Sequence, residues 1–348
     1  MIAAGGAVTQ ARTALAAMPV KDMESDISLP QSAAIERVKD RIQDFVRLAI
    51  RCAPARATPA MIQATLTAKG GAYKGVDVAA FEPGGELDYV AEAVPGRPGW
   101  IAVVPTFAIQ CGSDAMVMVF ARDHRGWQEM ISRRSKPYRS IDQGWMGLEY
   151  AVSQPDRSGR WYLAVASHTP WCMSIWRGLR YDLSRPGVRG GAAHVFFSKQ
   201  VGTYLGDTPD SMRATTRMFE IRHDGHSFVV GEARPHIERY AIAGDRVRRI
   251  QPAALNPRDF AEEWIVSPWA EAASWSAAGD RLKAEHAEIA AVYRKTGLDF
   301  GTIRRCGSGG QEVEVRPDKG APWYLLVNGT QPFTVRAAST MPSSQCRG

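Results

Sequence analysis

The stretch that decides the fold runs from Arg160 to Leu183 and reads RWYLAVASHTPWCMSIWRGLRYDL. It divides into two apolar segments, Arg160–His168 and Met173–Leu183, joined by the short connection Thr169–Cys172. Trp, Tyr, Leu, Val, Ile and Met dominate both segments, as is typical of paired strands on a packed surface. The sequence therefore predicts an antiparallel β-hairpin here.

The length of the connection predicts the register of this hairpin. If Thr169–Cys172 forms the loop, His168 pairs with Met173, and the alternation of side chains assigns every residue to one of two faces. Both faces are mainly apolar. We therefore expect each face to be covered by another layer, as in a layered or radial β architecture.

Turn signals at regular spacing extend the mainly β prediction beyond this hairpin. Between about residues 73 and 255, apolar segments alternate with turns such as Asp123–Gly126 and Ala243–Asp245. Asp224-Gly225 is predicted to be a two-residue turn that joins strands Met218–Arg222 and Ser227–Glu232. This pattern indicates an antiparallel meander. Because no unit repeats at a fixed period, a propeller-like body and a sandwich body are both open.

Helical patterns flank this β body. An apolar stripe at helical spacing follows Ser28, and Thr58-Pro59 begins a second helix. Residues 1–27 are predicted to be a disordered tail, with a signal-peptide remnant as the alternative. The predicted parts that follow are a β body with two N-terminal helices at 28–255, a helical connector at 256–297 and a small C-terminal β unit at 298–348.

The basic composition does not by itself indicate a nucleic-acid-binding protein. The 348 residues carry a net charge of +7, and the pI is near 9.2. The densest basic group, Arg133-Arg134 with Lys136, is short, and arginines are spread along the whole chain. A nucleic-acid-binding protein usually concentrates charge and aromatic side chains on one element. We therefore expect no nucleic-acid partner, whereas small-molecule, glycan and protein partners remain open.

The hydropathy of the chain and its cysteines give information on the cellular compartment of the protein. No stretch approaches the roughly 20 apolar residues that span a bilayer. The cysteines lack a C-x-x-C spacing, which argues against a structural zinc site. Two disulfides, Cys52–Cys111 and Cys306–Cys346, would leave Cys172 alone, and buried free thiols are the alternative. Disulfides would favour a periplasmic or secreted protein over a cytoplasmic one, if the chain start is misassigned.

Three histidines form one candidate site. His223 and His226 flank the predicted Asp224-Gly225 turn, so their side chains should face each other across it. His236 or Glu238 from the next hairpin would supply a third ligand, and imidazole is a common ligand of divalent metals. Two polar residues at a solvated turn are the alternative. We therefore expect no cofactor, with a divalent metal at His223, His226 and His236 as the lesser alternative.

The turn of the Arg160–Leu183 hairpin is the second candidate site. His168 ends an apolar strand, and Trp171 and Cys172 lie in the connection that follows. An exposed Trp offers a large rigid surface to a ligand, and His and Cys side chains supply polar contacts. A buried histidine and a packed thiol are the alternative. These three residues are predicted to contact a ligand.

The motifs of known chemistry are absent from the sequence. No G-x-S-x-G, S-x-x-K or H-E-x-x-H pattern occurs. The sequence therefore favours a non-catalytic binding or structural β protein. A hydrolase whose site is built on loops from His, Arg and Asp residues, with or without a metal, is the alternative.

Overall fold

The computed structural model describes residues 1–20, 26–54, 56–71, 83–110, 112–170, 177–187, 193–203, 209, 211–229, 231–307 and 309–347. The described residues are mainly β, with antiparallel strands, so the predicted fold class is confirmed at this level. The chain divides into two compact units. The first comprises Met1–Thr208 with Ala214–Arg217, and the second comprises Pro209–Arg213 with Met218–Gly348.

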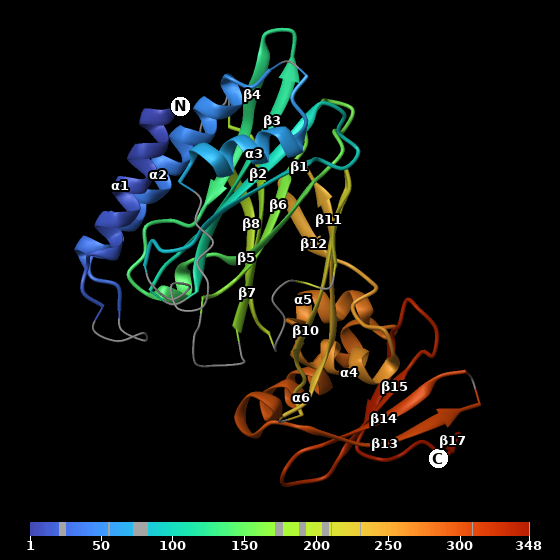
Figure 1. Ribbon diagram of the computed structural model, residues 1–348. Coiled ribbons are helices and arrows are strands. Elements are labelled where there is room, and N and C mark those ends of the chain that lie inside the picture. The colour runs from blue at the N-terminus through green and yellow to red at the C-terminus, as the bar shows by residue number, and fades with distance from the viewer. Residues whose placement is uncertain are drawn as a thin grey trace. The chain divides into compact units, whose positions relative to one another are not determined.

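A four-stranded antiparallel sheet lies at the centre of the first unit (Figure 1). Asp123 pairs with Gly126, so the predicted tight turn between the third and fourth strands is confirmed. The strands follow one another in space in chain order: β1 (Leu87–Ala93), β2 (Trp100–Ala108), β3 (Ser113–Asp123) and β4 (Gly126–Arg134).

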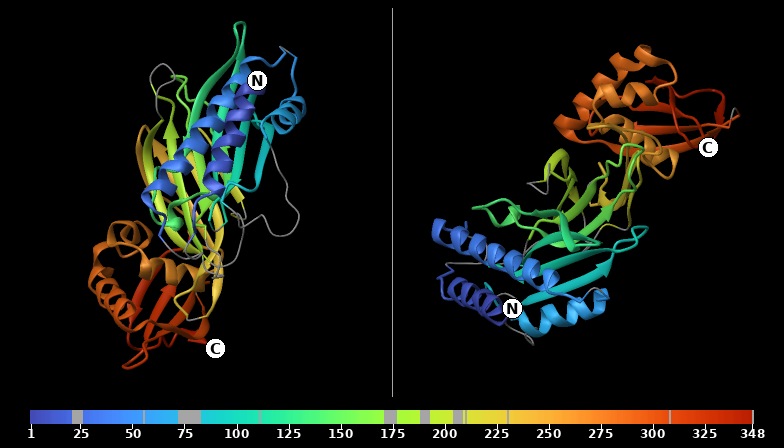
Figure 2. Two further views of the ribbon diagram at one scale, coloured as in Figure 1. Left: turned by 60° about the vertical axis from the view of Figure 1, so that its left-hand side comes forward. Right: turned by 90° about the horizontal axis from the view of Figure 1, so that it is seen from above.

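Three helices cover one face of this sheet, as Figures 1 and 2 show. The apolar stripe after Ser28 lies on the longest of them and packs with sheet residues such as Val103 and Met118 into one buried cluster. The Ser28 side chain accepts a hydrogen bond from the Gln31 amide, and the Gln31 side chain accepts one from the Ser28 amide, which caps that helix. The helices are α1 (Ile2–Ala16), α2 (Leu29–Arg51) and α3 (Pro59–Lys69).

Helix α1 occupies the segment that we expected to be a disordered tail or a signal remnant. Its small residues give no clear apolar stripe, and the sequence therefore offered little sign of packing. The buried Arg12 side chain supplies the anchor, because it donates to the Gly84 carbonyl at 2.8 Å and also to the carbonyls of Gly71 and Gly85. Burial lowers the pKa of Arg12, but its donors are satisfied by backbone oxygens.

A second group of antiparallel strands in the first unit packs on the other face of the four-stranded sheet. Ala102, Val117 and Val119 of the sheet share a buried apolar cluster with Leu163 and Val165 of this group. Helices, sheet and second strands therefore form successive layers in the first unit. The strands are β5 (Met146–Val152), β6 (Leu163–His168), β7 (Arg177–Arg185) and β8 (His194–Thr203), and the short helix η2 (Ile141–Gln143) precedes them.

Strands β6 and β7 are the two strands that the opening stretch predicts, but the predicted register is wrong. His168 pairs with Leu179 rather than with Met173, and Val165 pairs with Asp182. The segment between β6 and β7 is longer than the four residues that we assumed. Because the displacement is an even number of residues, the paired residues of β6 and β7 still lie on the faces to which the sequence assigned them.

The second unit combines a β-hairpin, a group of helices and a small sheet. Strand β10 (Met218–His226) pairs with β11 (Ala233–Ala243), which pairs with β12 (Arg246–Arg249) across the predicted turn at Ala243–Asp245. The short strand β9 (Ser211–Ala214) pairs with β10. The connector region contains α4 (Pro257–Val266), α5 (Trp269–Ala272), η4 (Ala273–Trp275), η5 (Gly279–Leu282) and α6 (Lys283–Thr296).

The C-terminal strands form a five-stranded antiparallel sheet (Figure 1). Phe260 and Trp264 of α4 pack with Val313 and Leu325 of this sheet in a buried cluster. The spatial order is β16 (Val335–Ser339), β15 (Trp323–Val327), β14 (Gln311–Arg316), β13 (Asp299–Cys306) and β17 (Cys346–Arg347).

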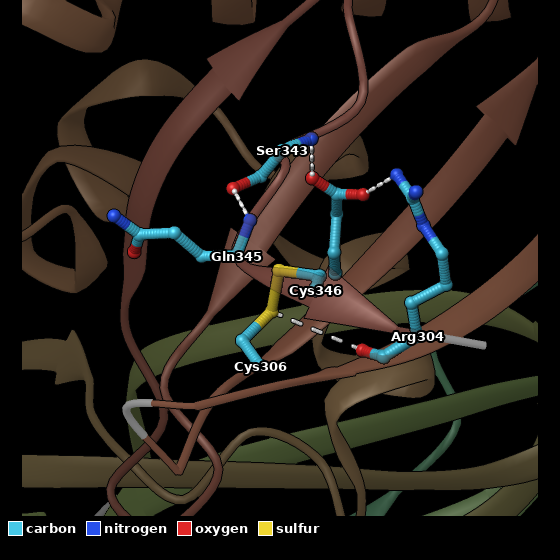
Figure 3. Close-up of a disulfide and its surroundings, with 6 residues drawn as sticks. Arg304, Cys306, Ser343, Gln345 and Cys346 are labelled. Atoms are coloured by element: carbon cyan, nitrogen blue, oxygen red, sulfur yellow. Dashed lines mark hydrogen bonds and ion pairs between the residues drawn. A yellow bond between two sulfur atoms is a disulfide. The ribbon is translucent and has the colours of Figure 1, made fainter.

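One of the two predicted disulfides is present. Cys306 and Cys346 are bonded and join β13 to β17 (Figure 3). Cys52 carries a free, exposed thiol, so the predicted bond between Cys52 and Cys111 is wrong. Cys111 itself lies outside the described residues. Within the described part of the chain, none of the helices combines the length and the apolar character needed to cross a membrane.

Candidate functional site

The structure tests only part of the candidate site at the β6–β7 turn. His168 is the last residue of β6 and is buried, with 2 % of its surface exposed. Trp171 and Cys172 lie outside the described residues. A buried His168 agrees with the alternative of a packed histidine at the end of an apolar strand. Ligand contact by the three residues stays a prediction.

The histidines of the second unit come together differently from the prediction. His223 and His226 lie on the same strand, β10, and do not face each other across a turn. Gly225 does not adopt the positive φ that the predicted turn type requires, so the strand continues through Asp224-Gly225. The chain instead reverses after it, in the segment that we predicted as the strand Ser227–Glu232, where the Ser227 amide donates to the Glu232 carbonyl.

His223 lies directly opposite His236 of β11. The two imidazole rings are stacked, with centroids 5.3 Å apart and planes inclined by 6°. Gly225 permits this packing, because a Cβ atom there would lie 2.7 Å from the His236 ring. The position therefore requires glycine for close approach rather than for a turn.

Both ring nitrogens of His236 face hydrogen-bond acceptors. Nδ1 is 2.9 Å from a carboxylate oxygen of Glu263, and Nε2 is 3.0 Å from the carbonyl oxygen of His226. Burial would raise the pKa of Glu263, but Arg249, the His236 hydrogen bond and Arg234 hold it well below the ordinary value. Because an ionised carboxylate only accepts hydrogen bonds, Nδ1 of His236 is the donor to Glu263.

A buried ion network surrounds this histidine. Arg249 contacts Glu263 at 2.6 Å and Glu238 at 3.0 Å. Arg234 contacts Glu263 at 2.7 Å and Glu262 at 3.1 Å. The network joins the β10–β11 hairpin to α4, and its charges are paired with one another. Its arrangement is that of a structural junction within the second unit.

A metal would find few ligands in this cluster. Both nitrogens of His236 are already engaged, whereas Nε2 of His223 is buried and has no hydrogen-bond partner in the described part of the chain. Burial, and then the charge of His236, lower the pKa of His223 to about 4, so its ring is neutral at neutral pH. Within the described ranges, no three His, Cys, Asp or Glu side chains are placed to hold a metal ion.

A basic pocket in the first unit is the site that the sequence did not predict. The cavity has a volume of about 480 Å³, within the usual range for small-molecule sites. Residues from β4 and the segment after it form one wall, and residues from β7 and β8 form the other. The lining residues are Arg133, Arg134, Lys136, Gln143, Trp145, Arg180, Asp182, Val195, Ser198, Lys199 and Gln200.

Cations outnumber anions around this pocket. Asp182 is the one acidic residue among the described residues of the lining, and it pairs with Arg133 at 2.9 Å. Arg134 is held by Asp40 of α2 at 2.7 Å. Arg180 hydrogen-bonds the neutral Gln200 at 3.2 Å and takes part in no ion pair among the described residues. Among the described lining residues, five are basic and one is acidic, so positive charge predominates around the pocket.

One of the paired cations also has hydrogen-bonding capacity left. Arg133 lies over the Trp145 ring, with its guanidinium carbon 5.5 Å from the ring centroid. Its Nε atom is buried and has no hydrogen-bond partner among the described residues. Asp182 and Trp145 thus hold the Arg133 side chain in place on this wall.

A buried network fixes the wall that carries Arg133, Lys136 and Trp145. The fully buried Asp114 carboxylate accepts hydrogen bonds from the Ser135 hydroxyl at 2.8 Å, from the Tyr138 hydroxyl at 3.0 Å and from the Trp145 amide at 3.0 Å. Three points of the segment after β4 are therefore tied to one carboxylate.

Lys39 of α2 balances this carboxylate. Its ammonium is 3.0 Å from Asp114 and 2.7 Å from Glu36, and its side chain is fully buried. Burial, together with Asp114, raises the pKa of Tyr138 well above its usual range, so the Tyr138 hydroxyl remains a donor. The wall of the basic pocket is thus held in place before any ligand binds.

The sequence contained part of the signal for this pocket. Arg133-Arg134 with Lys136 is the densest basic group of the chain, and it lies on one wall. Arg180 and Lys199 join it only through the folding of the strands, since both are far away in sequence. The basic group of the first wall can therefore be noticed in the sequence. The residues of the second wall cannot, because they come from distant strands.

Comparison of the chain with protein-family models, curated proteins and solved structures found no match.

Proposed function

We propose that the protein is a non-catalytic binding protein that takes a small, multiply charged anion in the basic pocket of its first unit. The observation that carries the proposal is the excess of Lys and Arg over carboxylates around a cavity of about 480 Å³. Phosphate and carboxylate groups are the anions that Arg side chains recognise best, because the planar guanidinium donates two parallel hydrogen bonds.

The fixed wall supports binding of a defined ligand rather than loose association with anions. Arg133 is oriented by Asp182 and Trp145, and the segment after β4 is tied to Asp114. A preorganised site loses less conformational entropy on binding than a set of mobile surface lysines does. We therefore expect the protein to discriminate between anions of different size.

Titration calorimetry with inorganic phosphate, pyrophosphate and citrate tests the proposal. At least one of these anions should bind, and Arg180→Gln should weaken that binding by about tenfold, since it removes a charge-assisted hydrogen bond. Lys136→Gln should act in the same direction. Arg246→Gln removes an exposed charge from the second unit and should leave the affinity unchanged. The proposal fails if no anion binds, or if Arg180→Gln binds like the unaltered protein.

A layered sandwich is the architecture that we propose for the β body of the first unit. The apolar cluster shared by β2, β3, β5 and β6 supports it over a propeller, in which blades are arranged around a central channel. The hydrolase alternative finds its best residues in the histidine cluster of the second unit. That cluster has its charges paired internally, so the anion-binding proposal has the stronger support.

A further inference from the structure

The first unit contains a second pocket, with a character opposite to that of the basic one. It has a volume of about 430 Å³ and lies where the beginning of α1, the end of α2 and helix α3 meet. Small apolar side chains leave this space open, because alanine and proline fill less volume than the leucine or isoleucine usual between helices. The lining consists of Met1, Ala49, Cys52, Ala53, Pro54, Ala57, Met61, Ile62, Ala64, Thr65 and Lys69.

The pocket combines a buried apolar floor with an accessible opening. Ala49, Ala57 and Ile62 are 3 % to 7 % exposed and belong to the core cluster beneath the helices. Met61 is 51 % exposed, although a large apolar side chain usually packs away from water. A flexible thioether at the mouth of a cavity adapts to ligands of different shape.

One cation stands at this otherwise apolar site. Lys69 is exposed at the end of α3, and no ion pair among the described residues includes it. Among the described residues, no Asp or Glu lines the pocket. An apolar cavity with a lysine ammonium at its edge is complementary to a molecule that has an apolar chain and one negative charge.

We propose that this pocket binds a medium-chain fatty acid, with the acyl chain among the alanines and Ile62 and the carboxylate at Lys69. The site is separate from the basic pocket and shares no lining residue with it. The proposal does not depend on the anion-binding function. It adds a second ligand of a different chemical class to the first unit.

The free thiol of Cys52 reports on occupancy of the pocket. Cys52 lines the cavity and is exposed, so a maleimide should label it in the absence of ligand. Decanoate should slow this labelling in a saturable way, and the concentration dependence gives its affinity. Cys52→Ser identifies the part of the labelling that belongs to other thiols. Labelling of Cys52 at an unchanged rate over the whole range of decanoate concentration would overturn the proposal.

Two variants test where the acyl chain and the carboxylate of the fatty acid bind in this pocket. Ala53→Phe places a ring in the cavity and should abolish protection by decanoate, which calorimetry with decanoate confirms independently of the thiol. Lys69→Gln should weaken decanoate binding by about fivefold, the effect of losing one exposed ion pair, and leave binding of the neutral alcohol decanol unchanged. If Lys69→Gln weakens both ligands equally, or neither, the assignment of the carboxylate is wrong. Anion binding in the basic pocket should persist in both variants, which separates this test from the earlier one.

Discussion

At the scale of single residues, the stacked histidines of the second unit show how environment sets protonation. His223 and His236 are the same residue type on paired strands, yet they face different groups. His236 has a carboxylate and a carbonyl as acceptors. His223 is buried beside that ring, and desolvation keeps it neutral. Two rings of the same type thus differ because His236 lies between two acceptors, whereas His223 is buried and neutral.

This environment predicts a pH-dependent stability. The pKa of His223 is about 4 in the folded protein and about 6.5 in the unfolded chain. Its folded pKa is depressed, so the unfolded state binds the proton first as the pH falls. The contribution of His223 to the free energy of unfolding should therefore be constant above about pH 6.5 and fall by about 3 kcal/mol towards pH 4.

Urea unfolding of His223→Gln at several pH values measures this contribution. The variant should lose the His223 part of the slope, while the charges that face this ring, His236, Glu238 and Glu263, remain. His124→Gln, at the exposed turn between β3 and β4, should keep the full slope. If the free energy of unfolding changed with pH by the same amount in His223→Gln and in the unaltered protein, His223 would not be the group that causes the pH dependence.

At the scale of elements, the C-terminal strand β17 depends on cross-links rather than on its own length. It comprises only Cys346–Arg347. Besides the disulfide, the Ser343 amide donates to the buried Glu312 at 2.7 Å, and Glu312 also pairs with Arg304 of β13 (Figure 3). A two-residue strand is thereby fixed at the edge of the sheet.

Removal of the disulfide should destabilise the second unit. Cys306 and Cys346 are 40 residues apart, and a cross-link over this distance stabilises the folded state by about 4 kcal/mol in the chain-entropy account. The double variant Cys306→Ser with Cys346→Ser should show this loss in urea unfolding. Cys52→Ser, which removes an exposed free thiol, should unfold like the parent. A double variant as stable as the parent would contradict the structural role.

Substitution at the buried ion pair between α2 and the four-stranded sheet should also destabilise the folded protein. Lys39 and Asp114 are both fully buried, so loss of one partner leaves the other charge uncompensated. Lys39→Met should lower the free energy of unfolding by about 3–5 kcal/mol. Arg160→Gln breaks the exposed pair with Asp156 and should cause a much smaller change. Equal losses for the two variants would mean that burial of the pair does not matter.

At the scale of the whole molecule, the class and order of elements could be read from the sequence, whereas long-range pairing could not. The capped start of α2, the tight turn at Asp123–Gly126 and the turn at Ala243–Asp245 depend on neighbouring residues, and all are present. The register of β6 and β7 depends on the length of the connection, which the strand pattern did not define. The prediction of a turn at Asp224-Gly225 was wrong. Glycine is required there because the His236 ring approaches closely, not because the chain turns.

The same difference between neighbouring and distant residues applies to the candidate sites. His223 and His226 were predicted to face each other across a turn, with His236 as a third neighbour, whereas the register places His223 opposite His236. The basic pocket needed two walls from distant strands, and the apolar pocket needed the ends of three helices. Neither cavity is visible in a linear pattern, since a cavity is defined by what the side chains leave unfilled.

Helix α1 carries a practical consequence for recombinant production of the protein. Its Ala- and Gly-rich sequence invites removal in the manner of a cleavable leader. Such a shortened protein would lose Arg12 and leave the carbonyl of Gly84 without its donor. It would also uncover the core that Val8 and Leu15 close. A purification tag therefore belongs at the opposite terminus, and the first helix should be kept.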